Sequence, residues 1–211
     1  ELREAGFTCP ILILGWTPEE GYASAIANEI RLALFDQEEA ARLNAQAISM
    51  GKKAMVHLKL DTGMSRIGLQ TNEAGLQAAE AILGMEGLEV EGIFSHFSKG
   101  DEYDKTFAYH QLEAFNGFYE QLVQRTGIRI PIRHMAASSA IIDIPEGYLD
   151  MVRPGIMLYG FQPSTEMHNV ADIKPALVWK ARLARVVKLP AGRLIGYNGT
   201  YELKQDTLVA T

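Results

Sequence analysis

The sequence predicts an α/β fold in which repeated strand–helix units build a parallel sheet. From Gly6 onward, short apolar runs alternate with segments of helical period, which is typical of parallel strands joined by helices. After Gly160 this alternation stops and antiparallel-type runs replace it. The units are too few to close an eight-stranded barrel and too regular for a small open nucleotide-binding sheet. We therefore expect a (β/α)8 TIM barrel that lacks its first strands, followed by the start of an all-β domain.

Each candidate barrel strand is an apolar run between turn signals. In chain order these strands are Cys9–Leu14, Arg31–Phe35, Met55–Leu60, Leu88–Ser95, Arg133–Ala136 and Met151–Pro154. Beyond the barrel, Val178–Leu189 and Tyr197–Ala210 are expected to be antiparallel strands. A boundary near Lys174 divides an expected barrel over residues 1–174 from the beginning of a β domain over residues 175–211.

Start and stop signals mark the helices. Thr17–Glu20 has the pattern of a capping box with proline at the first helical position, and Asp36–Glu39 repeats that logic. Gly51 and Gly127 are expected to end helices, and the opening ELREAG is expected to be the last turns of a helix closed by Gly6. One helical face is expected to pack in the core rather than form an aromatic binding box: Phe115, Phe118, Tyr119 and Leu122.

The composition argues against several classes of partner. The formal net charge is −6 and no basic stripe interleaved with aromatic residues is present, so nucleic acid is not an expected partner. The single Cys9 leaves no internal disulfide or cysteine metal cluster, and we expect its side chain to be buried. No apolar run approaches the roughly 18 residues of a membrane helix, and no signal peptide opens the chain. We expect a soluble, cytoplasmic protein without a metal site.

The candidate functional residues follow the carboxyl ends of the expected strands, where barrel enzymes place their chemistry. These positions hold Lys59, Arg66, His96, His134, Ser138 and Arg153, with Gly155 and Ile156 at the last turn. Backbone N–H groups of Gly155 and Ile156, with the Ser138 hydroxyl, suit a phosphate group. Arg153 and His96 are expected to supply cationic or hydrogen-bond donor groups beside the organic group that is attached to the phosphate.

Lys59 lies between Leu58 and Leu60 on an alternating strand, which points its ammonium into the sheet interior or mouth. An unpaired buried charge is expensive, so we expect Lys59 to have a partner or a modification. Considered alone, Lys59 could instead form an ordinary ion pair with Asp61. Arg66, considered alone, could instead form an ion pair at the surface.

Other polar residues carry weaker signals. Ser138 has no Gly-x-Ser-x-Gly context, so a serine nucleophile is not expected. Isolated His57, His110 and His168 are more typical of surface or satisfied core residues than of metal ligands.

Four runs, in this order and at these separations, resemble the bacterial alanine racemases: HLKLDTGMSRIG, EGIFSHFS, HMAASS and DMVRPGIMLYG. That family consists of enzymes dependent on pyridoxal 5′-phosphate, with an eight-stranded barrel and a C-terminal β domain. The segment GRLIGYNGTYE is similar to the context of the family's catalytic tyrosine. The resemblance covers essentially the whole chain.

The resemblance implies roles for the residues that would hold the cofactor. Arg153 corresponds to the arginine that bonds the pyridine nitrogen, and His96 to the histidine that holds this arginine in place. Ser138 and the backbone of Gly155 and Ile156 correspond to the contacts with the cofactor phosphate. An arginine at the pyridine nitrogen weakens the electron sink of the cofactor, which favours racemisation over transamination.

The resemblance also implies catalytic roles. Arg66 matches the arginine that reaches the phenolic oxygen of the cofactor and the substrate carboxylate. Lys59 matches a lysine that is carbamylated in many members, which would turn it into an anionic partner for Arg66. Tyr197 resembles one of the two acid/base groups, delivered to the site of the partner subunit in a homodimer.

The implied activity is that of an isomerase that interconverts L-alanine and D-alanine by a two-base mechanism and supplies D-alanine for peptidoglycan. The family's Schiff-base lysine on the first barrel strand has no counterpart here, so we expect the 211 residues alone to be inactive. Ala137 stands where many members have asparagine, and the family's second tyrosine and Met-Asp pair would lie beyond Thr211. Three alternatives remain: a serine or broad-specificity racemase, a non-catalytic barrel that binds pyridoxal phosphate, and an interaction module.

Overall fold

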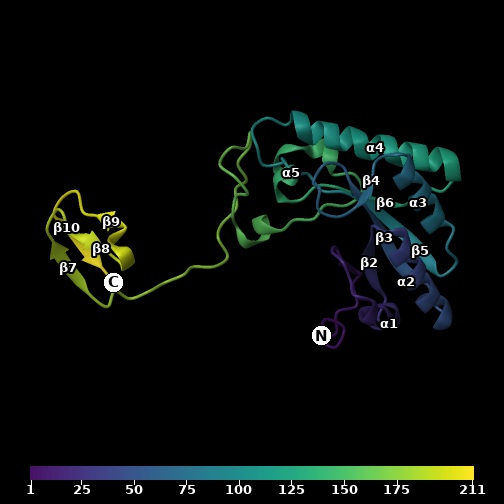
Figure 1. The fold of residues 1–211 in the computed structure, drawn as a ribbon, viewed down its shortest axis with the longest axis horizontal. Coiled ribbons are helices and arrows are strands. Elements are labelled where there is room, and N and C mark those ends of the chain that lie inside the picture. The colour runs from purple at the N-terminus through teal and green to yellow at the C-terminus, as the bar shows by residue number, and fades with distance from the viewer. The chain divides into compact units, whose positions relative to one another are not determined.

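The computed structural model describes residues 1–211 and consists of two compact units, Glu1–Pro175 and Ala176–Thr211. The first unit contains a parallel sheet with the order β1-β2-β3-β5-β6, and a short strand β4 pairs with β3 (Figure 1). The strands are β1 (Ile11–Ile13), β2 (Ile30–Leu34), β3 (Ala54–Asp61), β4 (Leu69–Gln70), β5 (Leu88–Phe94) and β6 (Ile132–His134). Spatial order that follows chain order is the wall of a βα barrel, which confirms the predicted fold class.

Helices connect the strands and pack against one another in chain order. The α-helices are α1 (Tyr22–Ala27), α2 (Gln37–Ser49), α3 (Glu73–Leu83), α4 (Thr106–Thr126) and α5 (Ser138–Asp143). Short 3-10 helices are η1 (Glu19–Gly21), η2 (Pro145–Gly147), η3 (Ile156–Tyr159) and, in the second unit, η4 (Tyr197–Gly199). Contacts between α1 and α2, α2 and α3, and α3 and α4 place these helices side by side on one face of the sheet (Figure 1).

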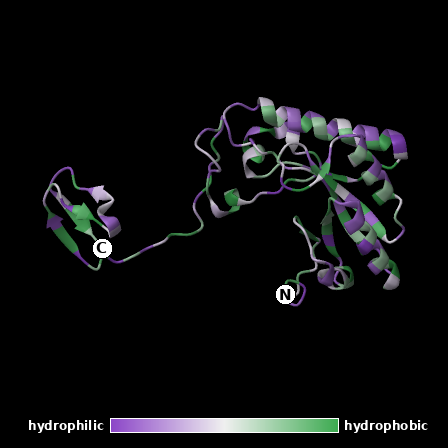
Figure 2. Cartoon of the chain, in the orientation of Figure 1, coloured by the Kyte–Doolittle hydropathy of each residue, from purple (hydrophilic) through white to green (hydrophobic).

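The hydrophobic core lies between the sheet and these helices. The predicted apolar face of α4 is confirmed: Phe115, Phe118, Tyr119 and Leu122 are all buried, and the Tyr119 hydroxyl donates to the Ile130 carbonyl at 3.1 Å. Figure 2 shows α4 with hydrophilic and hydrophobic residues interleaved along its length, as an amphipathic surface helix requires. No helix is both long and apolar enough to cross a lipid bilayer.

Some helix boundaries follow the sequence signals and others do not. Asp36 caps α2 by accepting the Glu39 N–H at 2.8 Å, as predicted, and Gly127 ends α4 in the left-handed conformation at φ 71°. The predicted cap at Thr17 is wrong, because the helical turn begins at Glu19 without a side-chain cap and the buried Thr17 Oγ1 has no partner. The opening residues form one turn that Gly6 ends, and not a helix.

Two further expectations are wrong for reasons connected with proline. Cys9 is exposed and not buried, since Pro10 cannot join a β ladder and β1 starts only at Ile11. The sixth predicted strand is reduced to a single parallel bridge between Arg153 and Ala137, because Pro154 has no N–H to extend it.

The second unit contains two antiparallel pairs, as predicted for the region after the barrel. Strand β7 (Val186–Leu189) pairs with β10 (Thr207–Ala210), and β8 (Leu194–Ile195) pairs with β9 (Tyr201–Glu202). The bounds of both predicted strands are wrong. The strand predicted from Val178 begins only at Val186, although the backbone of Arg185 exchanges hydrogen bonds with Thr211. The strand predicted over Tyr197–Ala210 is divided into the turn η4 and the two strands β9 and β10.

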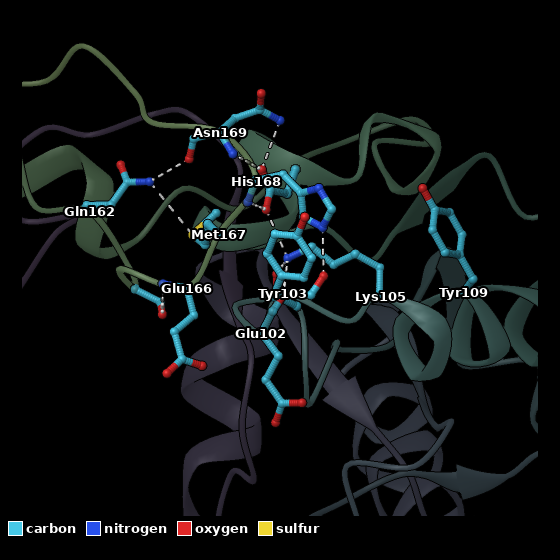
Figure 3. Close-up of polar contacts among 12 residues, drawn as sticks. Glu102, Tyr103, Lys105, Tyr109, Gln162, Glu166, Met167, His168 and Asn169 are labelled. Carbon is cyan, nitrogen blue, oxygen red and sulfur yellow. Dashed lines mark hydrogen bonds and ion pairs between the residues drawn. The ribbon is translucent and has the colours of Figure 1, made fainter.

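A loop over residues 162–169, here called the strap, contacts the segment before α4, where His168 lies against Tyr103 (Figure 3). The Asp143 carboxylate accepts the backbone N–H of His168 at 2.9 Å and pairs with the Lys105 Nζ at 2.9 Å. The rings of His168 and Tyr103 stack with their centroids 4.2 Å apart. These contacts fix the course of the chain just after η3.

Candidate functional site

The structure brings two of the predicted strand-end residues, His96 and His134, to the Arg153 guanidinium. Its Nη1 lies 2.7 Å from the His134 Nδ1 at the end of β6. Its Nη2 donates to the carbonyls of Ser95 at 2.8 Å and Met135 at 3.0 Å, and lies 3.3 Å from the His96 Nδ1. The ends of β5 and β6 and the Arg153 bridge therefore meet at one point.

Every group that contacts the Arg153 guanidinium is electrically neutral. The guanidinium forms no ion pair, and its Nε makes no hydrogen bond within the chain. The Phe94 ring lies 5.4 Å from the guanidinium carbon and stacks on His134 at 4.6 Å. Burial lowers the pKa of Arg153 to about 10, which leaves it charged at neutral pH. A half-buried cation without a counter-ion attracts an external anion or acceptor.

A second cation, Lys59, is fully buried, and backbone carbonyl oxygens accept hydrogen bonds from its ammonium group. It is only 2% exposed, and its Nζ donates to the oxygens of Leu60 at 2.5 Å and Ile67 at 3.2 Å. Burial lowers the pKa of Lys59 to about 8, and the positive charges of Arg153 and Arg66 add to this effect. Lys59 therefore has a partner, as expected, in the form of two backbone carbonyl oxygens.

Arg66 is exposed beside a hollow of about 370 Å³ that Asp61 and Gln70 also line. It makes no ion pair with any carboxylate. The Asp61 carboxylate instead accepts backbone N–H groups from the turn that carries Arg66, for example that of Ser65 at 3.0 Å. Burial alone would raise the pKa of Asp61, but the hydrogen bonds from these N–H groups hold that pKa below its usual value.

A cradle of hydrogen-bond donors follows Arg153 directly. The Ser138 Oγ accepts the N–H of Gly155 at 2.9 Å and, more weakly, that of Met157 at 3.4 Å. Ile156, which the sequence placed in this set, is half exposed and its N–H has no partner in the chain. Backbone N–H groups and a hydroxyl are the donors a phosphate needs, and Arg153 offers a donor to a ring nitrogen. The donor set therefore fits pyridoxal phosphate.

Sequence reasoning missed a buried histidine contact behind this site. The His57 Nδ1 lies 2.8 Å from the His134 Nε2, and both side chains are buried. Burial is the main cause that lowers the pKa of His57 and His96 to about 4, and that of His134 further. One signal was available: His57 stands two residues before Lys59, so both side chains lie on the same face of β3.

Two of the remaining candidates, His110 and His168, make no contact with this cluster, and a third, Tyr197, belongs to the second unit. His110 is exposed on α4, and His168 belongs to the strap. Tyr197 opens η4 in the second unit, where it is 97% exposed and its hydroxyl makes no hydrogen bond.

The chain is similar to known racemases over its whole length. It is 43% identical over 212 residues to the alanine racemase of Clostridium perfringens strain SM101. This alignment covers 100% of this chain and 55% of that protein. This chain is 41% identical over 210 residues to the alanine racemase of Desulfovibrio desulfuricans, with 100% and 56% covered. The chain thus spans little more than half the length of these relatives.

Solved structures give the same result. The alanine racemase of Clostridium difficile 630 matches with a TM-score of 0.82 at 36% identity, over 99% of this chain and 55% of that one. The alanine racemase of a D-cycloserine-producing Streptomyces lavendulae matches with a TM-score of 0.85 at 32% identity, over 99% and 56%. The family described as "Alanine racemase, N-terminal domain" matches residues 1–163. The chain therefore belongs to the alanine racemase N-terminal domain family.

Proposed function

We propose that the complete protein is an alanine racemase that interconverts L-alanine and D-alanine with bound pyridoxal phosphate. The observation that carries this proposal is that Arg153, held by neutral acceptors, stands two residues before Gly155, whose N–H lies against the Ser138 hydroxyl. In this role the protein would act in the cytoplasm and supply D-alanine for peptidoglycan precursors.

The residues of the barrel are proposed to hold the cofactor at two ends. The N–H groups of Gly155 and Ile156, with the Ser138 hydroxyl, would bind the phosphate, and His96 would help to keep the Arg153 guanidinium aimed at the pyridine nitrogen. When bound, the cofactor supplies an electron sink for the negative charge that forms at the substrate Cα. Because arginine only donates hydrogen bonds and does not lose its proton, Arg153 leaves the ring nitrogen unprotonated and moderates that sink. This favours reprotonation at Cα.

Racemisation requires a proton to leave one face of Cα and another to arrive at the opposite face. We assign one of the two acid/base groups to Tyr197, acting in the site of the partner subunit of a homodimer. The high exposure of this side chain within its own unit is compatible with such a role. The second base would be a lysine outside these 211 residues.

Arg66 is proposed to bind the substrate carboxylate and the phenolic oxygen of the cofactor. Lys59 is proposed to be carbamylated: its neutral amine attacks carbon dioxide, a C–N bond forms and a proton is released. The pKa of about 8 leaves a larger neutral fraction near pH 7 than an ordinary lysine has. The resulting anion would pair with the Arg66 guanidinium.

The test is a racemase assay on the complete protein, with L-alanine and L-serine measured in parallel. Conversion of alanine well ahead of serine supports the proposal, and comparable rates would favour a serine or broad-specificity racemase. A wider substrate range has one specific support, since a histidine racemase from Leuconostoc mesenteroides also matches this chain at a TM-score of 0.78 and 25% identity. Cofactor absorbance without turnover would indicate a non-catalytic barrel, and no cofactor binding an interaction module.

A further inference from the structure

Two buried imidazoles lie one behind the other on the inner side of Arg153. The Arg153 Nη1 is 2.7 Å from the His134 Nδ1, and the His134 Nε2 is 2.8 Å from the His57 Nδ1. No carboxylate makes a hydrogen bond or an ion pair with either ring. The nearest charged pair on neighbouring strands is Arg31 with Glu91, which bond to each other at 2.8 and 3.1 Å.

The direction of each hydrogen bond in this row follows from the chemistry of arginine. A guanidinium has no acceptor, so the His134 Nδ1 must accept and the His134 proton must lie on Nε2. That Nε2–H then donates to the His57 Nδ1, which places the His57 proton on its own Nε2. Each imidazole is thereby fixed in one neutral tautomer. The burial that keeps both rings uncharged at neutral pH supports this assignment.

The backbone of β5 is shaped to seat the His57 ring. Pairing between β3 and β5 runs from Val56 with Val90 directly to His57 with Gly92, so Glu91 is an extra, bulged residue. A Cβ atom at Gly92 would overlap the His57 imidazole. Bulges next to functional sites commonly redirect a side chain, and glycine inside a strand commonly marks a close approach. Both features occur where His57 meets its neighbour strand.

We propose that His57 is a positioning residue that orients the Arg153 guanidinium through His134, and that Gly92 is required to make room for it. This inference rests on the proposed cofactor site, because the value of a fixed guanidinium is that it meets the ring nitrogen. Without the His57 acceptor, the buried His134 Nε2–H has no partner. The His134 ring is then free to turn, and Arg153 loses the acceptor that aims its Nη1.

The test replaces His57 in the complete protein with leucine, glutamine or asparagine. Asparagine places its Oδ1 near the position of the Nδ1 acceptor, whereas glutamine reaches toward the far side of the ring and leucine offers no acceptor. We expect H57L and H57Q to weaken pyridoxal phosphate binding roughly tenfold to a hundredfold, because a buried donor is left unpaired. H57N should stay within about threefold of the wild type. If H57L fails to fold, the comparison of H57Q with H57N still decides.

A second readout needs no cofactor. Nitrogen-15 NMR of the His134 ring in the unloaded protein should show one Nε2–H tautomer in the wild type and H57N, and a mixture in H57L and H57Q. A matched control is L58V, which removes bulk from the next buried position of β3 and should change neither the tautomer nor the affinity. A single unchanged tautomer and unchanged affinity in H57Q would overturn the proposal. If the wild type does not bind pyridoxal phosphate, the proposed function fails, but the NMR result still tests whether His57 fixes the tautomer of His134.

Gly92 provides an independent test. G92A should reproduce the loss of affinity and the mixed tautomer of H57Q, because its methyl group displaces the ring. In an H57A background the same methyl group meets no imidazole, so H57A/G92A should bind the cofactor as well as H57A does. Additive losses in the double variant would show that Gly92 serves another purpose and would overturn the link to His57.

Discussion

Replacing Asp143 with asparagine should lower the free energy of unfolding of the complete protein by about 3 kcal/mol. The Asp143 side chain is fully buried, and the paired Lys105 side chain is 9% exposed. Removing one partner of a buried ion pair typically costs about 3–5 kcal/mol, because the remaining charge is left uncompensated.

The lower end of that range applies for two structural reasons. The Lys105 Nζ keeps the carbonyl oxygens of Gly100 at 2.9 Å and Glu102 at 2.5 Å, so its charge is not fully stranded. The asparagine Oδ1 can still accept one of the strap N–H groups that Asp143 accepts, such as that of His168.

Urea unfolding followed by circular dichroism would measure the loss. The matched control is D150N, because Asp150 pairs with Arg133 at 2.8 Å while both side chains are about one third exposed, at 37% and 34%. An exposed pair of this kind is worth less than about 1 kcal/mol. Equal losses in D143N and D150N would refute the reasoning that burial sets the strength of the Asp143 contact.

Three further outcomes are expected. Burial depresses the pKa of His57, His96 and His134, so the unfolded chain binds protons at these rings at a higher pH than the folded chain does. The free energy of unfolding should therefore fall as pH falls from about 6.5 toward 4, by up to about 3 kcal/mol per imidazole. A urea midpoint that stays constant over this range would contradict this prediction. S138A should weaken pyridoxal phosphate roughly tenfold in an absorbance titration while leaving the urea midpoint nearly unchanged, because one phosphate donor is lost; unchanged affinity would remove Ser138 from the cradle. Y197F in the complete protein should slow deuterium exchange at Cα from one alanine antipode far more than from the other; unchanged exchange from both would refute its acid/base role.

The strands of the barrel wall were predictable where their pattern is strong. For β2, β3 and β5 the predicted and observed ranges differ by at most one residue at each end, because buried parallel strands are continuous apolar runs. The sixth strand was not predictable, because a single proline after Arg153 limits its pairing to one bridge. The rule that strand ends gather functional groups predicted the meeting of Arg153 with His96.

The inner histidines could not be assigned from sequence for a physical reason. The seat of His57 depends on a shift in the β3–β5 register at Glu91, and a bulge leaves no clear trace in a hydrophobic pattern. The tautomer of His134 depends on Arg153, which is 19 residues away along the chain. A pattern that is read locally does not contain such a pairing.

The neutral surroundings of Arg153 have a consequence for how a ligand would enter. Many buried arginines are held by an aspartate or glutamate, and an incoming acceptor must then compete with that resident acid. Here the guanidinium is held by carbonyls and uncharged imidazoles, so no internal salt bridge has to break first. Association therefore requires little rearrangement, and the protein carries no acidic side chain of its own that would act as a built-in competitor.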